Sequence, residues 1–436
     1  MYAFNSCSRA LPRPKKHIAQ DTETGLRRTL FLPLIALYGL GNILGAGIYV
    51  LIGAVASTAG NFAPYSFILA AMVAGVTAFS FAELASRFSV SGGGALFIHK
   101  GFHKPQLTRL VGLMIIMTDV VSAATITRGF VGYVRVFAPV PKTVAIVGML
   151  ALLCGPACWG INESVVTAAL ITFVEVMGLL LIVWVAFRIS PDAAAINLGT
   201  LNPEATSLDA AVDENRFSLA ALVSGAFLAF YAYIGFEDMV NVAEEVKNPR
   251  RNMPLAIVIA ISLATALYVL VTWSALRVVP AAVLGSSDAP LAMVYEVATG
   301  ESSYLIAGIS LFAVINGALI QIIMGSRICY GLTREGLLPA WLGLFNGKIR
   351  TPINATILIT GCILLAAVWL PIETLARLTT ALLLLVFTLV NLALIRIKRE
   401  PKPEHELFEV AAWVPVLGLV TSAGFLMGET WNLLSG

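Results

Sequence analysis

Charged residues are scarce in this chain. The 28 Lys and Arg and 25 Asp and Glu residues make up only 12% of its 436 residues, while 58% are hydrophobic. Soluble domains are about a quarter charged and about half apolar. This composition therefore excludes an ordinary soluble fold and indicates a membrane protein.

Cysteine and histidine are also scarce. The five cysteines form no CxxC pair, and the four histidines are not clustered with thiols or carboxylates as zinc ligands are. The sequence has no GxxxxGKS/T phosphate loop, and its apolar runs contain no nucleophile–base pair. We therefore expect no metal, no cofactor, no enzymatic activity and no direct use of ATP.

Long apolar runs recur from Leu30 almost to the C-terminus. A helix that crosses a hydrocarbon core of roughly 30 Å needs about 20 mainly apolar residues. We predict eleven such spans, with a longer polar connection at residues 188–216. The spans are 30–55, 62–83, 107–127, 142–160, 165–187, 218–240, 254–277, 303–326, 352–370, 373–395 and 408–431. Residues 1–29 are expected to form a cytoplasmic tail, and residues 30–436 a single transmembrane domain in the lipid bilayer.

The basic residues predict the orientation, because cytoplasmic flanks of membrane proteins are enriched in Lys and Arg. With the N-terminus inside, 21 of the 28 Lys and Arg residues fall in cytoplasmic segments, and the odd number of spans leaves the C-terminus outside. The net charge of +3 follows from this placement and needs no nucleic-acid partner. We expect a multi-pass protein of the cytoplasmic (inner) membrane.

The first span carries four glycines in nine residues, within the run GLGNILGAGIYVLIG that begins at Gly39. Glycine in a membrane helix commonly serves close packing. The Gly-Ala-Gly sequence at 45–47 also permits backbone conformations that interrupt a helix. An interruption frees N–H and C=O groups, which hold a carboxylate and an ammonium group respectively. The run alone is compatible with a packing seam or with an amino acid-binding site.

The sixth span has a similar irregularity. Gly235 is followed by Glu237 and Asp238 before the apolar run has ended. Acidic residues at such a depth are costly unless they face water, a partner or a mechanism. Both are therefore functional candidates.

At this point the sequence resembles the amino acid-polyamine-organocation (APC) superfamily. The matching motifs are GNILGAGIY, AELASRFSVSGGGALF, GINES, YIGFEDMVNVAEEVKNPRRNMP, SRICYGLTREGLLP and VFTLVNLALIRIKRE, which occur in the expected order over residues 39–399. The third span, with DVVSAATITRGFVGY, is similar to the cationic amino acid transporter branch, although such small-residue strings also serve helix packing. Many members have twelve spans, whereas this chain has one span after the tenth.

The resemblance implies an all-α membrane protein of the LeuT type, built from two five-helix repeats of inverted topology. Residues 30–187 would form the first repeat, residues 218–397 the second, and residues 408–431 an additional helix. The first helix of each repeat would be unwound at the substrate site, near 45–47 and 231–235. The inverted-repeat argument places both interruptions at corresponding positions.

The resemblance also implies roles for single residues. N–H groups at 46–48 would hold the substrate carboxylate, and the carbonyls of Ile43, Tyr231 and Ile234 would receive its amine. Tyr231 would close over the ligand as a gate, or else serve only packing, and Glu237 would couple the sixth span to gating. The predicted substrate-binding residues are Ile43, Ala46, Gly47, Ile48, Tyr231, Ile234, Gly235 and Gln321.

Two further acidic residues bear on ion coupling. Glu175 stands where several proton-coupled relatives have a lysine, and a carboxyl in a dry environment favours its neutral form, so it could carry the proton or merely bridge helices. Asp119 in the third span could favour a cationic substrate, pair with Arg128 or serve packing. The leading hypothesis is a proton-coupled amino acid transporter; the alternatives are an amino acid or polyamine exchanger, sodium coupling, and a non-transporting membrane sensor.

Overall fold

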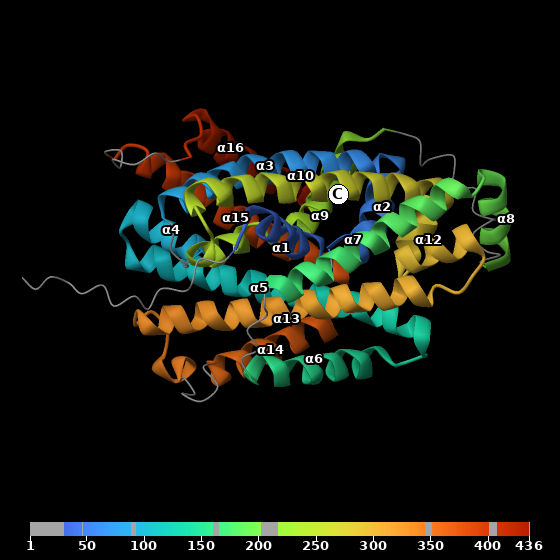
Figure 1. The fold of residues 1–436 in the computed structure, drawn as a ribbon, viewed down its shortest axis with the longest axis horizontal. Coiled ribbons are helices and arrows are strands. Elements are labelled where there is room, and N and C mark those ends of the chain that lie inside the picture. The colour runs from blue at the N-terminus through green and yellow to red at the C-terminus, as the bar shows by residue number, and fades with distance from the viewer. Residues whose placement is uncertain are drawn as a thin grey trace, which may run out of the picture.

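The computed structural model describes residues 30–45, 47–88, 93–159, 165–201, 217–344, 351–400 and 408–435. Over these residues the chain is a helical bundle with no strand, only an isolated bridge between Leu30 and Val246, which confirms the predicted all-α class (Figure 1). The helices are α1 Leu32–Leu44, α2 Gly47–Ala59, α3 Ala63–Arg87, α4 Gly93–Phe102, α5 Pro105–Phe137, α6 Lys142–Trp159, α7 Val165–Arg188, α8 Pro191–Leu201, α9 Leu219–Phe230, α10 Pro249–Val278, α11 Ala281–Ser286, α12 Pro290–Thr299, α13 Tyr304–Arg334, α14 Ile353–Trp369, α15 Ile372–Ile397 and α16 Trp413–Ser435.

Membrane-spanning character follows from the length and composition of the helices. Eight helical stretches in the described residues are long and apolar enough to cross a bilayer, and α1 and α14 are shorter apolar helices. Each of the eleven predicted ranges contains one helix, or two pieces separated by an interruption. Large apolar side chains such as Leu152 and Trp369 are exposed on the outside, as a lipid environment requires. The number of membrane crossings stays a prediction.

Several helices begin where the sequence places a proline. Proline occupies one of the first two positions of α1, α3, α5, α10 and α12. This position suits proline because the first N–H groups of a helix have no intrahelical acceptor. The connection expected at 188–216 is not wholly irregular, since α8 begins there at Pro191, and its Asn197 side chain donates to the Val297 carbonyl of α12 at 2.9 Å.

The two short helices α1 and α9 lie inside the bundle. α1 packs against α7 and α10, α9 packs against α2 and α3, and α13 lies along α5 at the side of this centre (Figure 1). Polar backbone is tolerated at this depth because surrounding helices shield it from lipid. The division into two inverted five-helix repeats stays a prediction.

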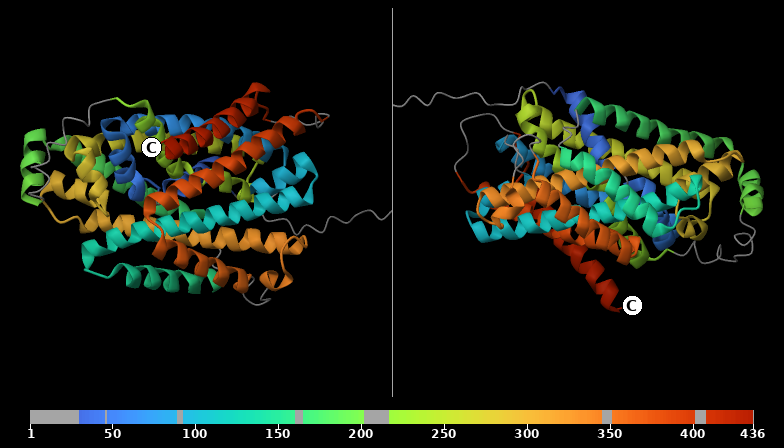
Figure 2. Two further views of the ribbon diagram at one scale, coloured as in Figure 1. Left: turned by 180° about the vertical axis from the view of Figure 1, so that it is seen from behind. Right: turned by 90° about the horizontal axis from the view of Figure 1, so that it is seen from below.

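The additional helix α16 contacts α15, α3 and α9, and its C-terminal end extends beyond the other helices in the right view of Figure 2. In its first half, Ser422 joins a buried chain of hydrogen bonds that runs through Thr77, Asn391 and Ser80. Towards its end, Glu429 forms an ion pair with Arg377 of α15, which also donates to Ser224 of α9 at 3.1 Å. α16 therefore links α3, α15 and α9 through polar groups.

A buried ion cluster joins the end of α3 to the end of α15. Glu83 is fully buried, and its two oxygens lie 2.7 Å from Arg87 Nη2 and from Lys398 Nζ. The N–H of Val410, just before α16, donates to the same carboxylate at 2.9 Å. One buried anion thus satisfies two cations and a backbone donor.

Glu83→Gln is expected to destabilise the protein strongly, by about 3–5 kcal/mol, because removing one partner of a buried pair leaves uncompensated charge. The matched control is Glu409→Gln, since Glu409 lies 3.6 Å from Arg87 and its side chain is 33% exposed. An exposed ion pair contributes only about 0.2–1 kcal/mol, so this variant should unfold almost like wild type. The measurement is thermal unfolding in detergent, and equal shifts for the two variants would contradict the cluster's role.

Candidate functional site

The first interruption lies where the glycine run predicts it. α1 ends at Leu44, the Gly45 N–H donates to the Gly41 carbonyl at 3.0 Å, and α2 begins at Gly47. The N–H groups of Gly47 and Ile48 belong to the first turn of α2 and have no intrahelical acceptor. A helix N-terminus of this kind attracts a carboxylate.

The second interruption is confirmed at the end of α9. The helix stops at Phe230, a 3₁₀ turn covers Tyr231–Tyr233, and a second 3₁₀ segment runs from Glu237 to Glu245. Between them Gly235 has φ 118°, a conformation that favours glycine. A β-carbon at this position would also lie 2.5 Å from the Asn42 carbonyl oxygen of the first interruption. Position 235 therefore requires glycine for two independent reasons.

The two interruptions touch each other at the centre of the bundle. A β-carbon at Gly47 would lie 2.6 Å from the Ala232 Cα, so the backbones approach more closely than any side chain would allow. The Tyr268 hydroxyl of α10 lies 2.7 Å from both the Ile43 and the Ala232 carbonyl oxygens. Its single hydrogen serves one of them at a time. Tyr268 therefore ties together the freed carbonyls of both helices.

A small cavity of about 30 Å³ lies between the interruptions. Pockets for drug-sized ligands hold about 300–1,000 Å³, so this conformation is closed around its centre. Two buried polar atoms of its walls, Asn42 Nδ2 and Gln321 Oε1, have no hydrogen-bond partner among the described residues. The cavity is lined by Gly41, Asn42, Ile43, Gly45, Gly47, Ser122, Ile126, Tyr231, Ile234, Asp238, Gly317, Ile320 and Gln321.

The structure brings most of the predicted substrate-binding residues together. Five of the eight line this central cavity: Ile43, Gly47, Tyr231, Ile234 and Gln321. Gly235 packs on the Asn42 backbone beside it. Ile48 is fully buried and does not belong to the cavity wall, and Ala46 lies outside the described residues.

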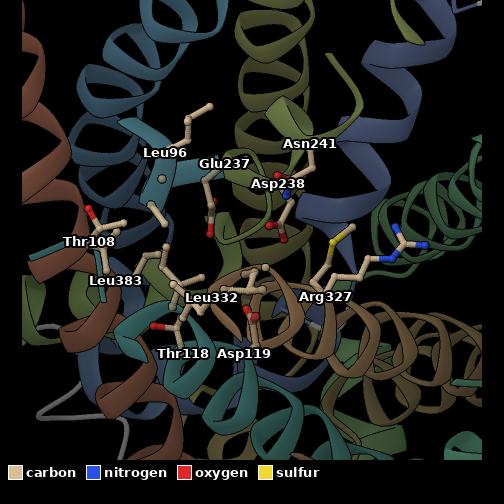
Figure 3. Close-up of a pocket in the computed structure, with 18 of the residues that line it drawn as sticks. Leu96, Thr108, Thr118, Asp119, Glu237, Asp238, Asn241, Arg327, Leu332 and Leu383 are labelled. Atoms are coloured by element: carbon tan, nitrogen blue, oxygen red, sulfur yellow. The ribbon is translucent and has the colours of Figure 1, made fainter. Parts of the chain in front are cut away.

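A larger vestibule of about 410 Å³ adjoins the central cavity. It lies between α4, α5, α13, α15 and the segment after Gly235, and Figure 3 shows the carboxyl groups of Asp119, Glu237 and Asp238 turned towards it from two sides. Asp238 lines both the vestibule and the central cavity. The vestibule therefore brings these three carboxyl groups, together with the guanidinium of Arg327, next to the interruptions.

Two of the predicted coupling or gating residues lie in this vestibule. Glu237 accepts the Gly235 N–H at 3.0 Å, so its carboxylate caps backbone that the interruption leaves free. Asp119 Oδ2 has no hydrogen-bond partner among the described residues. The pairing of Asp119 with Arg128 is wrong, because nine residues of α5 put Arg128 about 13 Å along the axis on the opposite face. Arg128 interacts electrostatically with Asp288 instead.

The third coupling candidate, Glu175, lies in the interior on α7. It is 1% exposed, and neither carboxyl oxygen has a hydrogen-bond partner among the described residues. It lines neither cavity, but the Tyr49 hydroxyl of α2 donates to its backbone carbonyl at 2.9 Å. Tyr49 and Tyr268 both lie within electrostatic range of its carboxyl. Glu175 therefore connects to the interruptions through neighbouring tyrosines.

Three polar residues of the cavity wall were not predicted to bind substrate: Asn42, Ser122 and Asp238. Asn42 lies inside the glycine run and Asp238 follows Glu237, so both had a local signal. Ser122 stands one helical turn after Asp119 among other small residues of α5, where nothing in the sequence distinguishes it. Its place in the cavity wall depends on how α5 packs against the second interruption.

Two interrupted helices that meet at a closed cavity inside an apolar bundle define a multi-pass membrane protein of the transporter class. The amino acid permease family model matches residues 31–431, and the chain belongs to this family. It is 26% identical over 426 residues to cationic amino acid transporter 3, mitochondrial, of Arabidopsis thaliana, covering 92% of this chain and 68% of that protein.

Two bacterial relatives have other substrates in their names. The chain is 28% identical over 424 residues to the branched-chain amino acid permease BcaP of Bacillus subtilis (strain 168), covering 92% of this chain and 87% of that protein. It is 27% identical over 443 residues to the methylthioribose transporter of the same strain, covering 95% and 91%. The resemblance to the permease superfamily is thereby confirmed.

Proposed function

We propose that this protein is a secondary active transporter that carries amino acids across the membrane by alternating access and does not convert them chemically. The observation that carries the proposal is the meeting of two interrupted helices at one central cavity. Half-helix N-termini and freed carbonyls bind both ends of an amino acid without charged side chains. The names of the relatives support an amino acid substrate.

In this proposal the first turn of α2 holds the substrate carboxylate, through the N–H groups of Gly47 and Ile48, while the same role predicted for Ala46 falls on a residue outside the described ones. The carbonyls of Ile43, Tyr231 and Ile234 receive the amine, in competition with Tyr268 at Ile43. Tyr231 closes over the ligand. Because the central cavity is only about 30 Å³, binding requires the walls to separate before substrate enters.

The vestibule indicates which side of the membrane this conformation faces. Its walls include His99, Thr108, Asn241 and Glu335, which lie at helix ends that the basic residues assign to the cytoplasm. We therefore propose that this conformation faces the cytoplasm, with the N-terminus inside and the protein in the inner membrane. Substrate would leave past Asp238, which lines both cavities.

For coupling, we propose that Glu175 carries a proton. A fully enclosed carboxyl without hydrogen-bond partners favours its neutral form, and transport would require it to gain and lose that proton as access alternates. The competing proposal is exchange of one substrate for another, with Glu175 as a structural residue.

A cationic substrate is the second candidate, within the same site. The carboxyl groups of Asp119, Glu237 and Asp238 suit an ammonium or guanidinium side chain, and they outnumber the one guanidinium of the vestibule wall, that of Arg327. The relatives named for branched-chain amino acids and methylthioribose support no such preference.

The test is uptake of a panel of radiolabelled amino acids into proteoliposomes, with and without an inward proton gradient. Gradient-driven accumulation is expected for at least one amino acid, and accumulation of lysine or arginine would select the cationic class. Uptake only into vesicles preloaded with substrate would contradict symport and establish an exchanger. No flux of any amino acid would contradict the transport proposal.

A further inference from the structure

Tyr231 is hydrogen-bonded to both the side chain and the backbone of Ser122 on the neighbouring helix α5. Its hydroxyl donates to the Ser122 backbone carbonyl at 3.0 Å and lies 3.1 Å from Ser122 Oγ. Only 3% of Tyr231 and 2% of Ser122 are exposed, and both line the central cavity. Because the tyrosine hydrogen goes to the carbonyl, the serine hydroxyl is the donor in the second bond. Both hydroxyls are therefore satisfied by this one pair.

The serine behaves differently from the other hydroxyl residues of α5. Thr118, Thr125 and Thr127 donate to the carbonyls four residues earlier in their own helix, at 2.9, 2.9 and 2.7 Å. Such a bond back to the same helix is the usual arrangement for a buried hydroxyl. Ser122 instead bonds across the interface to the interrupted segment after α9. Thr125 also reaches the Tyr231 hydroxyl, on the same face of α5.

We propose that Ser122 is a positioning residue that holds Tyr231 in its closed place in the cavity wall. The inference rests on the proposed function, since it assigns to Ser122 the control of the gate of that site. When the interrupted helix moves away from α5, both hydrogen bonds must break. The pair therefore favours the closed wall over the open one.

The two residues differ in what their variants remove. Ser122→Ala loses the hydroxyl but keeps the carbonyl, whereas Tyr231→Phe loses both bonds. The net contribution of one buried hydrogen bond corresponds to about a two- to tenfold change in an equilibrium constant. Because substrate enters only after the wall opens, and the loss of a bond that holds it closed raises the open fraction, Ser122→Ala should lower the KM for uptake about two- to tenfold. Tyr231→Phe should lower it further.

A double-mutant cycle separates positioning from direct substrate contact. If Ser122 acts through the Tyr231 hydroxyl, adding Ser122→Ala to Tyr231→Phe changes KM no further. A full additional effect in the Tyr231→Phe background would overturn the proposal and make Ser122 a substrate ligand. Thr127→Ala is the matched control, because it removes a fully buried hydroxyl of the same helix that bonds only within α5.

Hydrogen–deuterium exchange tests the pair without any transport assay. In substrate-free, purified full-length protein, Ser122→Ala should speed amide exchange in the segment 231–236 about two- to tenfold, whereas Thr127→Ala leaves it at the wild-type rate. Peptides from α10 report whether each variant is folded. Wild-type exchange at 231–236 in Ser122→Ala would overturn the proposal, even if the transported substrate proved not to be an amino acid.

Discussion

Gly47→Leu is expected to abolish amino acid binding and uptake. A β-carbon at position 47 would lie 2.6 Å from the Ala232 Cα, closer than such atoms approach in proteins, and 3.0 Å from the Ala232 Cβ. The second interruption would have to move away, and the rest of the leucine side chain would enter a cavity of only about 30 Å³. The measurements are equilibrium binding in detergent and uptake into proteoliposomes.

The matched control is Gly148→Leu on α6. A β-carbon there meets no atom within 4 Å, so leucine on this lipid-facing surface should leave binding and uptake at wild-type levels. Gly47→Ala gives an intermediate case, because the β-carbon alone already contacts Ala232. Unchanged affinity in Gly47→Leu, in protein that elutes as a single folded species, would remove the interruption from the substrate site.

Features encoded in a few neighbouring residues could be predicted from the sequence. The interruption at Gly45 to Gly47 and the one around Gly235 both appear where glycine allows a backbone that other residues resist. Apolar runs of span length likewise predict the helices, because membrane helices satisfy their hydrogen bonds within the segment. Such features need no knowledge of which helix lies beside which.

Features that depend on tertiary neighbours could not be predicted in this way. Ser122 lines the cavity because α5 faces the second interruption, a contact between residues 109 positions apart. The buried charge of Glu83 is balanced by Lys398, which lies just after α15 and is distant from Glu83 in the sequence. Of the three alternatives for Asp119, the pairing with Arg128 is wrong because helical periodicity separates the two side chains. Packing between helices decides each of these cases.

Glu175→Gln is expected to retain substrate binding and to lose accumulation driven by a proton gradient. Glutamine has nearly the same shape as a protonated glutamic acid, and the carboxyl lies outside both cavities, so the substrate contacts stay as they are. The hydrogen bond from Tyr49 goes to the Glu175 backbone carbonyl and survives the change. Only the exchangeable proton is removed. The measurement is uptake at matched external pH, with and without an imposed gradient, alongside binding affinity.

The control for this variant is Glu296→Gln on α12, which removes a half-buried carboxylate that accepts only a long bond, 3.5 Å, from Ser303. It should accumulate substrate as wild type does.

Proton-driven accumulation that persists in Glu175→Gln would exclude Glu175 as the proton carrier. Because a buried carboxyl without hydrogen-bond partners is costly to keep, it would then have to serve helix packing alone. In that case glutamine, whose amide introduces two further unsatisfied donors, should lower the unfolding temperature relative to Glu175→Leu. A transport role predicts instead that both variants lose gradient-driven uptake while exchange across preloaded vesicles continues.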